Sequence, residues 1–296
     1  MRVYRYVTVD VFTQQRFGGN PLAVVTDAQG LSDTEMQALA AEFNYSETTF
    51  VLPPDDPAHS ALVRIFNRAH EMPFAGHPNV GMGYVLAHEG RDIDGVLLFE
   101  ELAGLVEVRV ERNAAGAVIG STIVAPQPLS CGVELPVEVV ASCVSVAPND
   151  VLTETHSPII ASVGVGFLLV EVTGLALTRA APNPEAFERA LDRFAELNGR
   201  LSIHLYAVDG PGRLRARMFA PLAGTVEDPA TGSANAALAA LLLSLTRDER
   251  HVFDVVQGVE IGRPSLLHVT AERRENEIRA TIRGACVPVF RGEAIL

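Results

Sequence analysis

The sequence predicts an α+β protein of two similar domains, because one pattern occurs twice about half a chain apart. The stretches EMPFAGHPNVG (71–81) and EDPATGSANAA (227–237) share Glu-x-Pro-x-x-Gly-x-x-Asn, offset by 156 of the 296 residues. An Arg-x-Phe triplet precedes each copy (64–66 and 217–219), and an almost wholly apolar helical stretch follows each. This repetition indicates two domains related by a pseudo-twofold axis. Chance similarity of two Gly/Ala-rich segments is the alternative.

The first half begins with strand-like alternation over 3–12, a turn at Gly18–Pro21 and a second strand, LAVV. Ser32 and Glu35 form a capping box for a helix that we expect to end near Asn44. Strands are predicted from 48 and over 61–66, followed by an apolar helix from Gly76 to about 88 that is buried on most sides. Further strands are expected at 96–100, 105–112 and 118–124, and the segment 126–136 is interpreted as the crossover to the second half.

The second half repeats this scheme. Helices are predicted near 136–145, from Asn183-Pro184 to Asn198-Gly199, and over 233–245. Strands are predicted at 166–172, 216–219, 267–270 and 277–282, followed by the C-terminal VPVF. We place the domain boundary after residue 126, giving domains of residues 1–126 and 127–283.

Composition excludes several classes of function. A net charge of −13 argues against a nucleic-acid or anionic-membrane surface, which would need a basic patch. No apolar run approaches the roughly 20 residues that span a bilayer, so we expect a cytoplasmic protein. The chain contains no lysine, which excludes a Schiff-base lysine and a Walker A loop. No Gly-x-Gly-x-x-Gly follows a strand, and we therefore expect no nucleotide cofactor.

The cysteines and histidines offer no clear metal site. Cys131, Cys143 and Cys286 are too widely spaced for a zinc pattern and are interpreted as small buried hydrophobic residues. His70 and His77 form an H-x6-H spacing that matches no standard set of zinc ligands. We expect no metal.

The two glycine turns are candidate anion sites. A glycine before a helix exposes backbone N–H groups at the positive end of the helix dipole, where a carboxylate or enolate binds readily. The alternative is that Gly76 and Gly232 only let two buried helices approach neighbouring strands. Beside the turns lie His77, Asp228 and Ser233, which could bind substrate or move protons. Equally, Asp228 and Ser233 could cap a helix and His77 could be a core histidine.

Five ordered blocks in the chain resemble the phenazine-biosynthesis PhzF-like family of isomerases. They are DVFTQQRFGGNPLAVV (10–25), NYSETTFV (44–51), RIFNRAHEMPFAGHP (64–78), RMFAPLAGTVEDPATGSA (217–234) and QGVEIGRPS (257–265). The resemblance implies the diaminopimelate epimerase-like fold, in which each domain is a curved, mostly antiparallel sheet or barrel around a central apolar helix. It also implies a C-terminal strand (284–296) that rejoins the first domain, a site in the cleft between the domains, and a homodimer.

The resemblance further implies a set of site residues. Glu47 matches the family's acid/base, His77 its histidine, and Asp228 and Ser233 the aspartate and serine of its second turn; Asn20, Gly76 and Gly232 complete the expected site. Enclosure of a carboxylate in an apolar cleft raises its pKa, so that Glu47 could take a proton and return it without cofactor or metal. We expect Asp228 and His77 to hydrogen-bond the substrate or the base, and the turn amides to hold a substrate carboxylate.

The sequence also departs from the family pattern. Tyr45, Asn79 and Asn235 differ from its usual residues and are candidates to line the pocket, so the phenazine substrate is not transferred. Neither turn has a cysteine, which argues against two-thiol racemisation. The leading hypothesis is a cofactor-independent isomerase of a small carboxylated molecule. A lyase that abstracts a proton and expels a hydroxyl, and a non-catalytic binding protein, are the alternatives.

Overall fold

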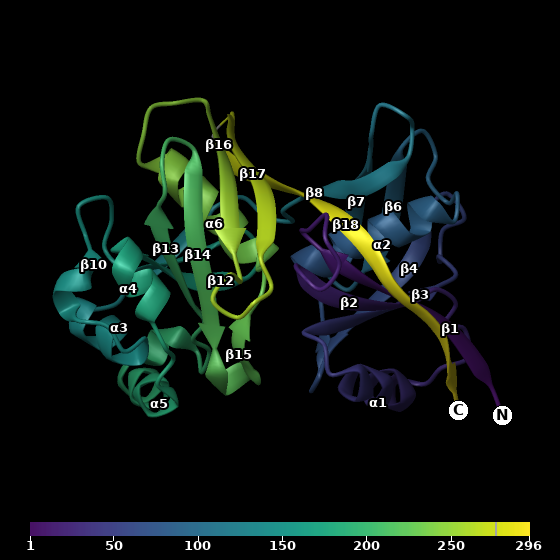
Figure 1. Cartoon of the computed structure of the whole chain (residues 1–296), viewed down its shortest axis with the longest axis horizontal. Coiled ribbons are helices and arrows are strands. Elements are labelled where there is room, and N and C mark those ends of the chain that lie inside the picture. Colours follow the sequence, from purple (N-terminus) through teal and green to yellow (C-terminus); the bar gives the residue numbers. More distant parts are fainter. Residues whose placement is uncertain (276) are drawn as a thin grey trace. The chain divides into compact units, whose positions relative to one another are not determined.

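The computed structural model describes residues 1–275 and 277–296, and it divides the chain into two compact units. Unit 1 comprises Met1–Pro126 and Ile282–Leu296, and unit 2 comprises Gln127–Thr281. The final strand, β18 (Glu277–Ile295), begins in unit 2 and continues into unit 1 (Figure 1).

Unit 1 contains two helices among its strands. The helices are α1 (Asp33–Phe43) and α2 (Gly76–His88). The strands are β1 (Val3–Val11), β2 (Asn20–Val25), β3 (Glu47–Leu52), β4 (Ala61–Asn67), β5 (Glu71–Met72), β6 (Val96–Glu101), β7 (Gly104–Arg112) and β8 (Val118–Val124), joined by the later part of β18.

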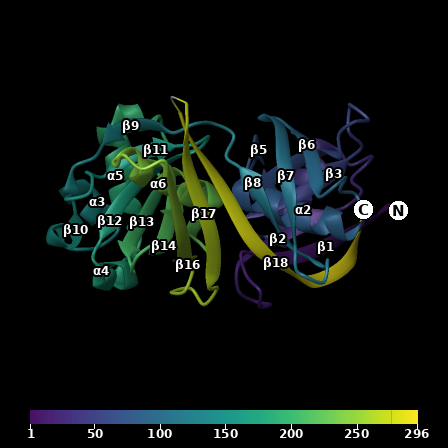
Figure 2. The same ribbon diagram turned by 90° about the horizontal axis from the view of Figure 1, so that it is seen from above.

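Strand pairing closes unit 1 into a barrel. The ladder runs β18–β1–β2–β3–β4–β6–β7–β8 and returns to β18. The β2–β3 and β4–β6 pairs are parallel, whereas the pairs within β18–β1–β2, β3–β4 and β6–β7–β8 are antiparallel. Helix α2 lies among these strands (Figure 2), and every residue from Gly76 to Ala87 is buried. A nearly all-apolar helix suits this position because it meets side chains on every side.

Two glycines of α2 allow this close packing. A Cβ atom at Gly81 would lie 2.7 Å from side-chain carbons of both Val11 and Leu22, and one at Gly83 would lie 2.5 Å from Val108. Larger side chains at these positions would push the helix away from the barrel wall. The Gly-x-Gly of this helix is therefore a packing feature.

Unit 2 carries more helices. They are α3 (Val137–Cys143), α4 (Gly174–Arg179), α5 (Pro184–Arg193) and α6 (Gly232–Ser244). The strands are β9 (Ser130–Glu134), β10 (Val151–Leu152), β11 (Ile159–Ser162), β12 (Gly166–Val172), β13 (Ile203–Val208), β14 (Arg213–Ala220), β15 (Thr225–Asp228), β16 (Arg250–Gln257) and β17 (Ser265–Arg274).

The two faces of the unit 2 sheet pack against different helices. Strands β9, β11, β12, β13, β14, β16 and β17 pair in that order, with β12–β13 and β14–β16 parallel. Ile203 and Leu205 of β13 join a core with residues of α3, α4 and α5, including Phe187. His204, on the opposite face, contacts Asn235 of the buried helix α6. Alternation along a strand thus separates an outer helical layer from the central helix.

The sequence repeat is visible in the structure as a repeated ion pair. Arg64 of β4 makes two hydrogen bonds to Glu71, and Arg217 of β14 makes two to Glu227. Each guanidinium also lies over the phenylalanine two residues later, 5.1 Å from the Phe66 ring centroid in unit 1 and 4.8 Å from the equivalent ring in unit 2. The glutamate of the repeated motif therefore anchors the turn to the preceding strand.

Strand register shows that the two units are built alike. Ile65 pairs with Met72 as Met218 pairs with Asp228, and Ala61 pairs with Phe99 as Leu214 pairs with Val255. Residues of β4 therefore correspond to residues of β14 at one constant offset. Their partners in β5 and β6 correspond to those in β15 and β16 at an offset of 156, which is that of the sequence repeat. The predicted α+β fold, with a curved sheet around an apolar helix in each half, is confirmed.

Some local predictions were wrong. The helix that begins after Asn183 ends at Arg193 rather than at 198–199, and a separate 3-10 turn occupies Ala195–Leu197. Strands β13 and β16 were not predicted, and β9 lies within the segment interpreted as a crossover. Cys131 is exposed, whereas Cys143 and Cys286 are buried as expected.

Candidate active site

Glu47 and His77 lie in direct contact within unit 1. Glu47 is the first residue of β3, and its Oε2 is 3.1 Å from Nδ1 of His77, the second residue of α2. The side chains are 17% and 5% exposed, respectively. Nδ2 of Asn20, the first residue of β2, is 3.4 Å from the same Nδ1. The structure thus brings together three predicted site residues from three separate elements.

The imidazole of His77 is held neutral by its surroundings. Burial lowers its pKa from 6.5 to about 3, and a hydrogen bond to the Pro21 backbone acts in the opposite direction. Nε2 of His77 is buried and has no hydrogen-bond partner within the described residues. A neutral ring that directs Nδ1–H toward the carboxylate keeps Nε2 as an acceptor.

Asp228 lies at the second turn, where its side chain is engaged locally. It is the last residue of β15 and is buried. Oγ1 of Thr231 donates to Oδ2 of Asp228 at 2.6 Å, and Nε2 of Gln257 donates to the Asp228 carbonyl at 2.9 Å. Asp228 therefore orders the turn that leads into α6, whereas the cap of α6 is Thr231, with no side-chain cap hydrogen bond.

The block QGVEIGRPS holds this turn from the other side. Oε1 of Gln257 accepts hydrogen bonds from the Thr231 amide and from Nδ2 of Asn235, at 3.1 and 2.9 Å. Gly258 has φ +77°, and a Cβ there would lie 2.5 Å from the carbonyl oxygens of Pro229 and Arg263. Glycine is required at this position, and the block is a support for the turn.

The glycine turns leave the starts of both central helices without a side-chain cap. Helix α2 begins at Gly76 and α6 at Gly232, and neither preceding residue, Ala75 or Thr231, accepts a hydrogen bond from the first turn with its side chain. Ser233 is half-buried and makes no side-chain hydrogen bond within the described residues. Uncapped first turns retain N–H groups and positive potential that can bind an anion.

Corresponding positions in the two units carry different chemistry. Ser233 occupies the place of His77, and Met72 that of Asp228, because the turns share one spacing. Thr48 pairs with Phe66 in unit 1, and Ile203 pairs with the equivalent phenylalanine of β14 in unit 2, so Thr48 and Ile203 occupy equivalent positions. The residue before each is then also equivalent, and unit 2 has Ser202 where unit 1 has Glu47. The repeated scaffold therefore holds the carboxylate–imidazole pair in unit 1 only.

Two further residues that were expected to line a pocket belong to the scaffold. Asn79 and Asn235 are fully buried, and each donates from Nδ2 to the backbone carbonyl four residues earlier, at 3.1 and 3.0 Å. The expectation of pocket-lining roles for them was wrong, because the repeated asparagine ties the first turn of each helix together. Tyr45 is half-buried and stacks on Phe43, with ring centroids 6.1 Å apart.

Sequence reasoning missed Thr231 and Gln257 as individual members of the second turn. The sequence did mark the segment that contains Gln257, because QGVEIGRPS was one of the five blocks that resemble the family. Its contact with the turn could not be deduced, since residues 231 and 257 meet only through the placement of β16.

The chain belongs to the PhzC-PhzF family of phenazine biosynthesis-like proteins, whose model matches residues 9–292. It is 36% identical over 300 residues to a trans-2,3-dihydro-3-hydroxyanthranilate isomerase of Pseudomonas chlororaphis, covering 99% of this chain and all of that protein. It is 35% identical over 304 residues, and the full length of both chains, to an uncharacterized isomerase of Mesorhizobium japonicum. The crystal structure of a PhzF-family phenazine biosynthesis protein from Bacillus anthracis matches with a TM-score of 0.86 at 26% identity, over 100% of both chains.

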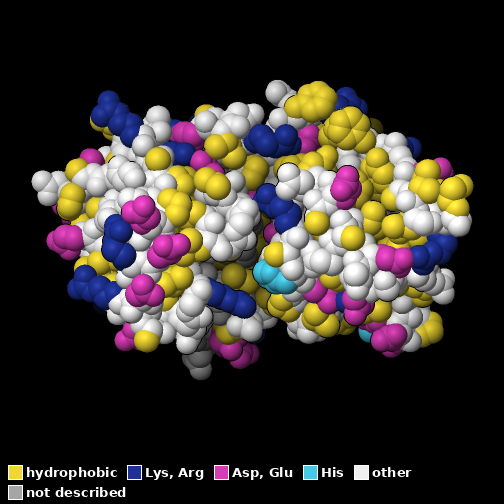
Figure 3. All heavy atoms as spheres, turned by 90° about the horizontal axis from the view of Figure 1, so that it is seen from below, with side chains coloured by type: hydrophobic (Ala, Val, Ile, Leu, Met, Phe, Trp, Pro, Cys, Tyr) yellow, Lys and Arg dark blue, Asp and Glu magenta, His cyan; other side chains and the backbone are white. Residues whose placement is uncertain are grey.

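These relatives identify the protein as an isomerase of this family. Over residues 1–275 and 277–296, no helix has the length and apolar character needed to cross a membrane. On the face shown in Figure 3, arginine and acidic side chains are interspersed.

Proposed function

We propose that the protein is a cofactor-independent isomerase that moves a proton within a small carboxylated molecule, with Glu47 as the acid/base. The observation that carries the proposal is the 3.1 Å contact between Oε2 of Glu47 and Nδ1 of His77. A carboxylate held at this distance from a neutral imidazole is fixed in orientation without being neutralised by a cation. It can therefore accept a proton from carbon and return it to another position.

The other predicted residues support this step in our proposal. His77, neutral because of its burial, orients Glu47 through Nδ1 and offers Nε2 as an acceptor for a substrate hydroxyl or amine. First-turn amides beginning at Gly76 bind a carboxylate oxygen, and in unit 2 those beginning at Gly232, together with the Ser233 hydroxyl, form a second anion-binding turn. Asp228 keeps this second turn in shape by accepting from Thr231. Asn20 lies against the imidazole, with its Nδ2 3.4 Å from Nδ1 of His77. Proton return by the same carboxylate needs neither cofactor nor metal.

The substrate class is inferred from the relatives. The Pseudomonas protein is named for trans-2,3-dihydro-3-hydroxyanthranilate, a carboxylated molecule with a hydroxyl and an amine. We propose a small carboxylated substrate of this general kind, without transferring the particular compound. We also propose that the protein is a cytoplasmic homodimer, which light scattering can test.

The test is a matched pair of glutamine variants. Glu47→Gln removes the proposed base with little change of shape, whereas Glu42→Gln makes the same change on an exposed residue of α1. Turnover of trans-2,3-dihydro-3-hydroxyanthranilate and of a panel of cyclic and amino-acid carboxylates is followed by mass spectrometry. We expect kcat to fall about 10²–10⁴-fold in the Glu47 variant only. A folded Glu47→Gln protein with full activity would refute the assignment.

Product mass separates the enzyme alternatives. An isomerase gives a product of unchanged mass in ordinary water, and a lyase gives one that has lost water. Tight binding of a panel compound without any turnover would instead favour the non-catalytic alternative.

A further inference from the structure

Glu101 is a buried carboxyl that the proposed reaction does not use. It is the last residue of β6 and is 9% exposed, and within the described residues its carboxylate oxygens have no hydrogen-bond partner other than the side-chain amide of Asn79 beside them. A buried carboxylate with so little compensation is costly, so its surroundings favour the protonated form. Unit 2 has a residue at the equivalent position, and the hydrogen bonds of that residue show its structural role.

The counterpart of Glu101 is Gln257. Strands β4 and β6 are parallel, as are β14 and β16, and the pairing of Ala61 with Phe99 repeats in unit 2. Two residues further along, β6 ends at Glu101 and β16 ends at Gln257, at the spacing of the sequence repeat. The same place beside the start of the central helix therefore holds a carboxyl in unit 1 and an amide in unit 2.

Gln257 fastens the turn in unit 2 by acting as acceptor and donor together. Its Oε1 accepts from Asn235 and from the Thr231 amide, and its Nε2 donates to the Asp228 carbonyl and to Oγ1 of Thr231. By the repeat, the corresponding unit 1 groups are Nδ2 of Asn79, the Ala75 amide and the Met72 carbonyl. An ionised glutamate can only accept, whereas a protonated one has one acceptor and one donor, like an amide.

We propose that Glu101 is a positioning residue that, in its protonated form, fastens the turn before α2 as Gln257 fastens the turn before α6, and thereby holds His77 against Glu47. The carbonyl of the carboxyl takes the place of the amide oxygen, and its hydroxyl that of the amide nitrogen. Loss of the proton removes the donor and releases the turn. The link to His77 and Glu47 rests on the proposed function, whereas the fastening of the turn does not.

The electrostatics of Glu101 agree with this geometry. Burial raises its pKa from 4.5 to about 8, and the Asn79 amide beside it acts in the opposite direction. No charged group contributes to this pKa within the described residues. The titratable groups of the surrounding segments form hydrogen bonds or ion pairs with residues other than Glu101. These pairs are Glu100 of β6 with His59, Glu71 of β5 with Arg64 of β4, Glu107 of β7 with Arg109, and His77 of α2 with Glu47.

The first test is hydrogen exchange of the turn, measured on full-length protein at pH 6.5 and 9 and corrected for intrinsic rates. In the wild type we expect protection of residues 72–79 to fall roughly tenfold or more at the higher pH, because a carboxyl with a pKa of about 8 is then mostly ionised. Glu101→Gln should keep the protection at both pH values. The reciprocal variant Gln257→Glu should confer pH dependence on residues 228–235.

The outcomes separate this inference from the proposed function. Equal pH dependence in the wild type and in Glu101→Gln, or none in the wild type, overturns the role of Glu101. If the turn responds as expected, kcat of the wild type should fall above pH 8 while that of Glu101→Gln should not. An exchange result as expected, together with full activity of Glu47→Gln, would leave the fastening role intact and refute only the proposed base.

Discussion

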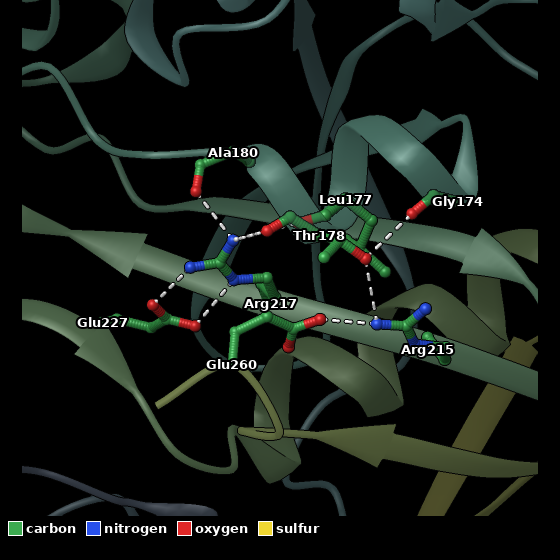
Figure 4. Close-up of polar contacts among 8 residues, drawn as sticks. All are labelled: Gly174, Leu177, Thr178, Ala180, Arg215, Arg217, Glu227 and Glu260. Atoms are coloured by element: carbon green, nitrogen blue, oxygen red, sulfur yellow. Dashed lines mark hydrogen bonds and ion pairs between the residues drawn. The ribbon is translucent and has the colours of Figure 1, made fainter. Parts of the chain in front are cut away.

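The repeated arginine–glutamate pair allows one interaction to be compared at two depths of burial. Arg217 and Glu227 are 7% and 8% exposed, whereas Arg64 and Glu71 are 20% and 23% exposed. Arg217 also donates to backbone carbonyls of α4 and the segment after it, with Nη1 2.7 Å from the Ala180 oxygen (Figure 4). Removal of Arg217 would leave a buried carboxylate and these carbonyls without their donor.

We predict that Arg217→Ala lowers the free energy of unfolding by about 3–5 kcal/mol, the cost of breaking a buried ion pair from one side. Arg64→Ala should cost about 1–2 kcal/mol, because water can replace the lost donor at its more exposed carboxylate. Urea unfolding of both variants beside the wild type, with separate probes for each unit, gives the two values. Equal losses, or a larger loss for Arg64→Ala, would refute the argument from burial.

Three further predictions follow from packing and protonation. A Cβ at Gly120 would lie 2.0 Å from the Gly284 carbonyl, so Gly120→Ala should lower the free energy of unfolding by about 1–3 kcal/mol. A Cβ at Gly174 would meet no atom within 4 Å, so Gly174→Ala should change it by less than about 0.5 kcal/mol. Comparable losses for the two variants in thermal unfolding would contradict this. Between pH 4.5 and 8 the folded chain retains a proton on Glu101 that the unfolded chain releases. As pH rises through this range, the stability of the wild type should therefore fall relative to that of Glu101→Gln by up to about 1.4 kcal/mol per pH unit. Parallel curves of stability against pH for the two proteins would contradict this. Burial lowers the pKa of His77 from 6.5 to about 3, so the stability that the neutral buried ring contributes should be lost as pH falls from 6.5 to 3. NMR should show a neutral His77 ring at about pH 5, and a native-state pKa near 6.5 would contradict this prediction.

Much of the fold could be predicted because local signals agreed with the tertiary structure. The capping box of Ser32 and Glu35 starts α1, and Asn44 ends it in a left-handed conformation. The two apolar helices and the duplicated turn indicated the repeat directly. Strands β13 and β16 were missed because their pairing is decided by partners distant in sequence, and Phe194 ends its helix although it continues the apolar spacing.

The candidate site was predicted less completely than the fold. Resemblance to the family singled out Glu47 and His77, but spacing alone could not show that residues 47 and 77 come within 3.1 Å. Asn79 stood beside the turn in sequence and was misassigned, because burial depends on the barrel that surrounds α2. Glu101 carries no local signal, and its place becomes apparent only from strand register.

The central claim is tested most directly by deuterium wash-in. Wild type and Glu47→Gln are incubated in D₂O with a carboxylated substrate identified from the panel, and substrate and product are analysed by mass spectrometry. Proton transfer through Glu47 predicts deuterium in the product of the wild type, with no loss of water, and no incorporation above the uncatalysed rate in the variant. Incorporation by folded Glu47→Gln at the wild-type rate would contradict the account.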